Sequence, residues 1–145
     1  MNTTALKLVL DTNILIAIIG KKSPFRWIFD CFIQGKIILC VSNEILLEYQ
    51  EILIRKTSEE VAENVINFII VNPFTEKNEI FFNFRLISDD LDDNKFVDCA
   101  IASNAICLVS NDKHFQALKK IDFPKVVVLK LQEFEDTYKD LLTSV

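Results

Sequence analysis

The chain has 145 residues, of which 50% are hydrophobic, and its formal net charge is −5 at pH 7. This length fits a single domain, residues 1–145, with a substantial hydrophobic core. The acidic charge argues against a protein that coats nucleic acid over its whole surface. The two glycines, Gly20 and Gly35, stand too far apart for a dinucleotide-binding or phosphate-binding glycine loop.

Neither the cysteines nor the apolar runs point to a metal site, a membrane span or a signal peptide, and a cytoplasmic location is expected. The four cysteines form no C-x-x-C pair and, with a single histidine, make a poor zinc set. Buried, reduced thiols are therefore expected. No apolar run approaches the ~20 residues that span a bilayer, and Asp11 interrupts the first apolar run in a way that a signal peptide does not.

Apolar, β-rich runs alternate with segments of helical periodicity, which is typical of an α/β fold whose parallel sheet is covered on both sides. Strands are expected at 6–10, 36–41, 106–109 and 126–131. Helices are expected at 14–19, 24–34, 43–56, 59–71, 96–104 and 132–142, with a helical turn or two at 113–119. Residues 80–82 and 84–87 are candidates for short extended pieces. The helix at 59–71 is expected to bury Val61, Val65, Phe68 and Ile69.

The first strand ends on an acid, Asp11, which is followed by Thr12 and Asn13. In open α/β sheets ligands bind beyond the carboxyl ends of the strands, so Asp11 is a candidate site residue. Aspartate is also a preferred helix N-cap, and this stretch alone leaves both interpretations open.

The strand at 106–109 repeats this pattern, because Ser110, Asn111 and Asp112 follow it at once. Parallel strands place all their carboxyl ends at one edge of the sheet. Asp11 and Asp112 are therefore expected to be neighbours if their strands are adjacent.

Two helices present further acids to the same edge. Glu48 borders the apolar side of the helix at 43–56, from which it can lean over the end of the sheet. Asp93 is in register with the apolar side of the helix at 96–104, and an inward acid is costly unless it caps, pairs or binds a metal. Capping and metal binding both stay open for Asp93, while Asp98 projects from another side of its helix and is not assigned.

Carboxylates gathered at one edge repel one another strongly. A hard divalent cation held by oxygen ligands, Mg²⁺ or Mn²⁺, is the usual remedy. Such ions serve phosphoryl chemistry by activating water and neutralising phosphate charge. The sequence therefore predicts a metal-dependent enzyme that needs no His, Cys or Ser nucleophile.

Four short motifs carry a resemblance to a known family. They are Leu10-Asp11-Thr12-Asn13, Ser42-x-x-Ile45-Leu46-x-Glu48, Asp92-Asp93-Asn94-Lys95-Phe96 leading into Cys99-Ala100, and Leu108-Val109-Ser110-x-Asp112. In this order and spacing the chain resembles the PIN-domain ribonucleases over almost its full length, in particular the VapC-like toxins of prokaryotic toxin–antitoxin pairs.

The resemblance implies a three-layer α/β/α sandwich around a five-stranded parallel sheet, and cleavage of RNA with Mg²⁺ or Mn²⁺. It places the family's acidic quartet on Asp11, Glu48, Asp93 and Asp112, with Asn13 or Ser110 as a polar helper. Ser110 stands where the family mostly has threonine. Asp92 and Asp98 compete with Asp93 for the third acidic position.

An acidic protein that binds RNA needs basic side chains around its site. The candidates are Lys21, Lys22, Arg26, Lys95 and Lys113. Twelve phenylalanines exceed what a core of this size commonly takes, and exposed apolar patches usually mark an interface. A homodimer is therefore expected. The resemblance adds an inhibitory antitoxin whose Arg or Lys reaches Asp11 and Asp112.

Two other functions compete with a ribonuclease. Phosphatases of the haloacid-dehalogenase type also begin with a strand that ends in Asp, but their D-x-D motif would need an acid where Asn13 stands. A degenerate PIN fold that only binds RNA or a partner protein is the second alternative.

Overall fold

The computed structural model describes residues 4–88 and 90–144. Within these residues, five strands form one fully parallel sheet in the order β3-β2-β1-β4-β5. The strands are β1 (Leu6–Leu10), β2 (Ile37–Val41), β3 (Thr75–Lys77), β4 (Cys107–Val109) and β5 (Val128–Leu129). The predicted fold class, a parallel sheet flanked by helices, is confirmed.

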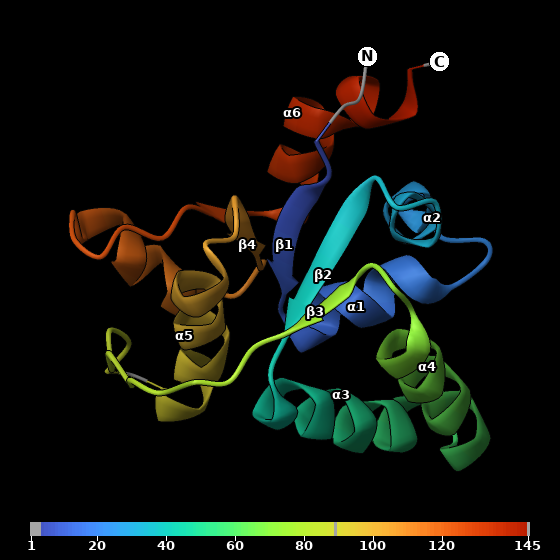
Figure 1. Cartoon of the computed structure of the whole chain (residues 1–145), viewed down its shortest axis with the longest axis horizontal. Helices are drawn as coiled ribbons and strands as arrows, with labels where there is room; N and C mark the ends of the chain where they lie inside the picture. The colour runs from blue at the N-terminus through green and yellow to red at the C-terminus, as the bar shows by residue number, and fades with distance from the viewer. Residues whose placement is uncertain (1–3, 89, 145) are drawn as a thin grey trace.

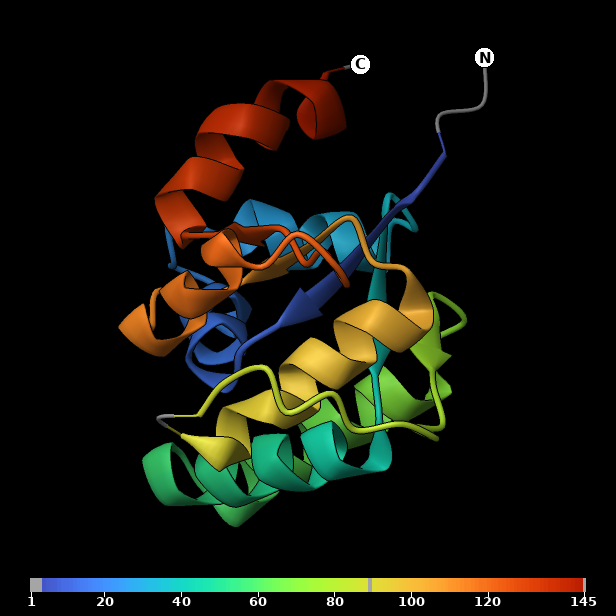
Figure 2. The same ribbon diagram turned by 90° about the vertical axis from the view of Figure 1, so that its left-hand side faces the viewer.

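Helices cover both faces of this sheet (Figure 1). They are α1 (Thr12–Ile19), α2 (Arg26–Ile33), α3 (Asn43–Lys56), α4 (Glu59–Val71), α5 (Asn94–Ser103) and α6 (Leu131–Thr143), with short 3₁₀ helices η1 (Leu91–Asp93) and η2 (Lys113–Lys120). One layer is α5, which contacts β1, β2 and β4, while α2 and α6 pack against β2 and β5. Figure 2, turned by 90°, shows α5 running across the front of the sheet, with α3 and α4 below it.

The central strand β1 explains why the sheet forms in this order. Leu8 and Val9 are fully buried, so β1 needs a neighbour on each side and a helix on each face. Leu8 pairs with Leu39 of β2 and with Cys107 of β4, and Leu10 pairs with Val109. This register brings the residues after β1 and β4 to the same level at the carboxyl edge of the sheet.

Helix α3 runs beyond that edge rather than over a face, as Figure 1 shows below β1 and β2. Ser42 caps it, because its Oγ accepts a hydrogen bond from the Ile45 amide at 3.3 Å. The fully buried Tyr49 donates its hydroxyl to the Leu10 carbonyl oxygen at 2.5 Å. This bond ties α3 to the last residue of β1.

The structure corrects several expectations. The strand expected at 126–131 is only the two residues of β5, because Leu131 already begins α6. The fifth strand is β3, whereas 80–82 and 84–87, the candidates for extended pieces, lie in a segment without regular secondary structure. Helix α5 begins at Asn94, two residues earlier than expected. Helix α4 buries Ala62, Ile66 and Ile69, so its inward face is rotated away from Val61 and Phe68.

All four cysteines are free and buried, as expected. Burial raises the pKa of Cys31, that of Cys40 to about 11, and those of Cys99 and Cys107 to about 12. Across the described residues, no helix combines the length and the apolar character that crossing a membrane requires.

Candidate functional site

Asp11 and Ser110 meet where β1 and β4 end. The Asp11 amide donates to the Val109 carbonyl oxygen at 3.1 Å, which continues the pairing of the two strands by one residue. The Ser110 hydroxyl then donates to Asp11 Oδ2 at 2.7 Å, and the same Oγ accepts from the Asp112 amide at 3.0 Å. A fully buried serine therefore holds the two acids in a fixed relation.

Asp11 stands at the N-cap position of α1, but its side chain makes no capping hydrogen bond. It is 7% exposed. Burial raises the pKa of the Asp11 carboxyl, the Ser110 hydrogen bond opposes that rise, and the charges of Asp112 and Glu48 add to it. The capping interpretation left open by the sequence thus does not describe this side chain.

Glu48 reaches the same edge from α3. Its Oε2 accepts a hydrogen bond from the Thr12 hydroxyl, and its Oε1 lies 2.8 Å from Lys95 Nζ. The Glu48 side chain is 20% exposed and that of Lys95 14%, so this ion pair is well shielded from solvent. The predicted border position of Glu48 is confirmed.

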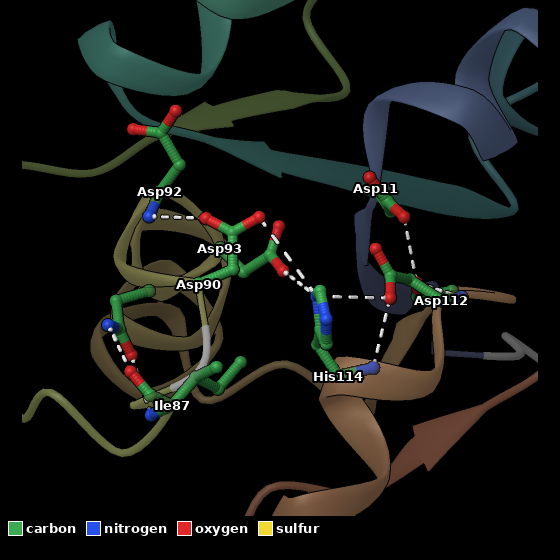
Figure 3. Close-up of polar contacts among 9 residues, drawn as sticks. Asp11, Ile87, Asp90, Asp92, Asp93, Asp112 and His114 are labelled. Carbon is green, nitrogen blue, oxygen red and sulfur yellow. Dashed lines mark hydrogen bonds and ion pairs between the residues drawn. The ribbon is translucent and has the colours of Figure 1, made fainter.

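Asp112 and Asp93 face each other across His114 (Figure 3). Asp112 caps η2, because its Oδ1 accepts from the His114 amide at 2.9 Å. Asp93 does not cap α5 with its side chain, and its Oδ2 lies 3.4 Å from His114 Nδ1. Burial, helped by the charges of Asp90 and Asp112, raises the pKa of Asp93 to about 6, although the contact with His114 opposes the rise.

The competing candidates for the third acidic position lie elsewhere. Asp98 is buried, accepts a hydrogen bond from the Phe84 amide at 3.1 Å, and lines a hollow of about 340 Å³ with Glu44 and Arg85. The Asp92 side chain is 85% exposed and lies 3.9 Å from Lys95 Nζ. Asp93 is thus the one of the three that is brought towards Asp112.

The predicted basic residues fall into two groups. Lys21, Lys22 and Lys113 are exposed. The other two are engaged within the fold: Arg26 pairs with Asp30 at 3.0 Å, and Lys95 pairs with Glu48. The ion pair with Asp30 holds the Arg26 side chain along α2, so this side chain is not free to bind a ligand.

Asn13 is bonded to a basic residue, Lys56, which the sequence did not predict near the site. It is exposed, and its Oδ1 accepts a hydrogen bond from Lys56 Nζ at 3.0 Å. Lys56 lies in the last turn of α3. Its place on the exposed side of an amphipathic helix gave no signal, because only the packing of α3 across the sheet edge brings it to Asn13.

The side chains present suit a divalent ion. Asp11 and Asp112 line a hollow of about 250 Å³ together with Asn13 and Asn111. Asp93 Oδ2 and His114 Nδ1 are buried polar atoms without a hydrogen-bond partner. Carboxylate oxygens are the ligands that Mg²⁺ and Mn²⁺ prefer, and a bound cation would satisfy both the crowded charges and the unpartnered atoms.

Comparison with known proteins agrees with this architecture. The chain is similar to VapBC2 from Rickettsia felis bound to a DNA fragment from its promoter, with a TM-score of 0.60, 18% identity, and coverage of 86% of this chain and 98% of that chain. It is also similar to DNA-bound VapBC from Salmonella typhimurium, with a TM-score of 0.53, 16% identity, and coverage of 87% and 98%. At such identities the likeness shows the fold. A search of curated proteins gave no match.

A family model described as PIN domain matches residues 7–114, which include Asp11, Glu48, Asp93 and Asp112. The match spans most of the sheet and the whole acidic edge. The chain therefore belongs to the PIN domain family.

Proposed function

We propose that this protein is a Mg²⁺- or Mn²⁺-dependent endoribonuclease and the toxin of a toxin–antitoxin pair. The observation that carries the proposal is the buried carboxylate of Asp11 at the end of the central strand, with Asp112 beside it through Ser110. Glu48 and Asp93 complete a set of four acids. PIN-family membership and the likeness to VapBC complexes support the same conclusion.

The protein's own groups hold and orient the site. Asp11, Asp112, Asp93 and Glu48 supply oxygen ligands, while Ser110 fixes the first two and Thr12 orients Glu48. When bound, a divalent ion supplies an activated water, neutralises phosphate charge and stabilises the leaving oxygen. The exposed Lys21, Lys22 and Lys113 are the side chains we assign to the RNA backbone.

The partners follow from the same site. Both similar structures are of VapBC bound to DNA, and we propose a cognate antitoxin for this chain. The hollow lined by Asp11 and Asp112 is negative, so a cationic side chain of that antitoxin, Arg or Lys, fits it. We also propose a homodimer as the unit that the antitoxin binds.

Cleavage of single-stranded RNA by purified protein tests the enzyme. Wild type should cut in Mg²⁺ or Mn²⁺ and lose activity in EDTA. Asp11→Asn should lower the rate by at least about a hundredfold, because it removes a ligand rather than a supporting group. Asp140→Asn on the exposed side of α6 is the charge-matched control and should cut normally.

Three results separate the alternatives. Full activity of Asp11→Asn, or of wild type in EDTA, rejects the metal-dependent mechanism. RNA binding without cutting in either metal indicates a silent PIN fold. Turnover of a small phosphate ester instead of RNA indicates a phosphatase, which the polar, uncharged Asn13 disfavours.

A further inference from the structure

His114 is the one histidine of the chain, and the fold directs its side chain towards the acidic site. Asp112 caps η2 through the His114 amide at 2.9 Å, so the imidazole is held two residues after a proposed ligand and points back over it. Figure 3 shows the ring between Asp112 on one side and Asp90 and Asp93 on the other.

Three carboxylates surround a single ring nitrogen. His114 Nδ1 lies 3.4 Å from Asp93 Oδ2, 3.4 Å from Asp112 Oδ1 and 4.0 Å from Asp90 Oδ2. Ligand atoms of Asp90, Asp93 and His114 all lie within 4.8 Å of one another. Asp90 uses its Oδ1 to accept from the Asp92 amide at 3.1 Å, which leaves Oδ2 facing the imidazole.

Nδ1 of His114 and Oδ2 of Asp93 are both buried and make no hydrogen bond. Such atoms carry a desolvation cost that a partner must offset. Two ligand atoms that share one tetrahedral ion at about 2.0–2.2 Å lie about 3.3–3.6 Å apart. The 3.4 Å between His114 Nδ1 and Asp93 Oδ2 falls within this range, and Asp90 Oδ2, at 4.0 Å from Nδ1, lies just outside it.

We propose that His114 Nδ1, with Asp90 and Asp93, forms a nitrogen-containing ligand set that binds a divalent transition metal ion of the kind that imidazole prefers, such as Zn²⁺, in preference to Mg²⁺. The inference shares Asp93 with the proposed function but adds His114 and Asp90, which the acidic quartet lacks. Imidazole suits Zn²⁺, Fe²⁺ and Ni²⁺, whereas Mg²⁺ keeps to oxygen ligands and water. The histidine therefore determines which ion the site selects.

A single histidine makes the binding measurable without activity. In untagged, ¹⁵N-labelled protein, the imidazole gives one pair of nitrogen signals, and Zn²⁺ serves as a diamagnetic probe. Saturating Zn²⁺ should shift the Nδ1 signal and leave Nε2 protonated. Saturating Mg²⁺ should move the backbone amides of residues 11–13 and 110–112 without shifting Nδ1 in this way.

Matched variants test the ligand set by calorimetric titration with Zn²⁺ and Mg²⁺. His114→Gln and Asp90→Asn should each weaken Zn²⁺ binding by at least about tenfold and Mg²⁺ binding by less than about twofold. Asp92→Asn is the control, because it removes a neighbouring carboxylate that is 85% exposed and should change neither affinity. Thermal unfolding in EDTA verifies that each variant folds.

The outcomes are distinct. An unmoved Nδ1 at saturating Zn²⁺, with shifted amides at residues 11–13, overturns the nitrogen ligand and leaves the proposed ribonuclease intact. Equal weakening of Zn²⁺ and Mg²⁺ binding by His114→Gln also overturns it, because His114 then only counterbalances the charges of the acids. If no divalent ion moves any of these amides, both this inference and the proposed function fail.

Discussion

Ser110 forms hydrogen bonds with two of the proposed ligand residues, Asp11 and Asp112. Its substitution should therefore lower the rate of cleavage by displacing these acids. In Ser110→Ala, Asp11 Oδ2 loses its donor and the Asp112 amide its acceptor. A hydrogen bond to a charged group contributes about 1.5–3 kcal/mol, so cleavage should slow by roughly ten- to a hundredfold. Initial rates at saturating Mn²⁺ measure this.

Ser110→Thr is the conservative partner of that variant. It keeps the hydroxyl and should cleave within a few-fold of wild type. A Ser110→Ala protein that cleaves at the wild-type rate would show that the serine does not hold the site.

The raised pKa of Asp93 predicts how the stability of the metal-free protein depends on pH. This pKa is raised from the ordinary 3.8 to about 6 in the folded protein, so the folded state holds the proton more tightly than the unfolded state. The stabilisation from that proton is complete below pH 3.8 and is lost as the pH rises through about 6. The metal-free protein should thus lose stability across this range.

Asp93→Asn should remove this pH dependence. In urea unfolding with EDTA, the variant should be more stable than wild type at pH 8, by on the order of 1–3 kcal/mol, and the difference should shrink towards pH 4. Asp140→Asn, outside the site, is the control. A constant difference between the two pH values would contradict the raised pKa.

For individual residues, the sequence predicted the acids that follow strands, but it did not predict the other site residues, His114 and Asp90. Asp11 and Asp112 could be placed together because parallel strands share an edge. His114 and Asp90 could not, since their approach depends on how the turn after Asp112 and the loop before α5 direct their side chains. The short Asp112-x-His114 spacing, typical of an aspartate that caps its own turn, was the available signal.

The first residue of α5 anchors the irregular segment between β3 and η1 through two side-chain hydrogen bonds. The buried Asn94 accepts from the Ile87 amide at 2.9 Å and donates to the Ile87 carbonyl oxygen at 2.9 Å. Asn94→Ala leaves both backbone groups unpaired in a buried position. The cost should be about 2–4 kcal/mol, measured by denaturant unfolding.

Hydrogen exchange gives a local reading of the same variant. The Ile87 amide should exchange much faster in Asn94→Ala, whereas Asn83→Ala, at an exposed asparagine of the same segment, should leave it protected. Unchanged exchange at Ile87 in Asn94→Ala would mean that other contacts hold the segment.

Most elements followed from periodicity, and the exceptions have physical causes. β3 has three residues, Thr75–Lys77, at the polar edge of the sheet, so it shows no apolar run. The phenylalanines at 81, 82 and 84 gave a stronger β signal, but Phe81 and Phe82 are exposed. In α4 both sides are apolar, and Phe68 packs against Phe29 of α2 at a ring-centroid distance of 5.8 Å, so periodicity could not fix the inward face.

For the whole molecule, exposed apolar side chains gather on α3 and α4. Leu47 is 66% exposed, Ile70 58% and Val71 77%. Leu47 and Ile70 also line a largely apolar groove of about 460 Å³ between the two helices. Such a surface suits the proposed homodimer.

Light scattering at micromolar concentration measures the assembly. We expect a mass of twice 16.7 kDa for wild type, and 16.7 kDa for Leu47→Glu if this surface forms the contact. Glu63→Lys, at an exposed polar position of α4, is the control. A wild-type mass of 16.7 kDa rejects the dimer.

The buried cysteines have a practical consequence for such experiments. Thiol reagents attack the thiolate, and in this protein four inaccessible sulfur atoms with raised pKa values hold almost none of it at neutral pH. A cysteine introduced at an exposed position such as Lys119 would therefore be the one site that maleimide modifies. Fluorophores and spin labels can be attached to η2, which follows Asp112, without first removing any native cysteine.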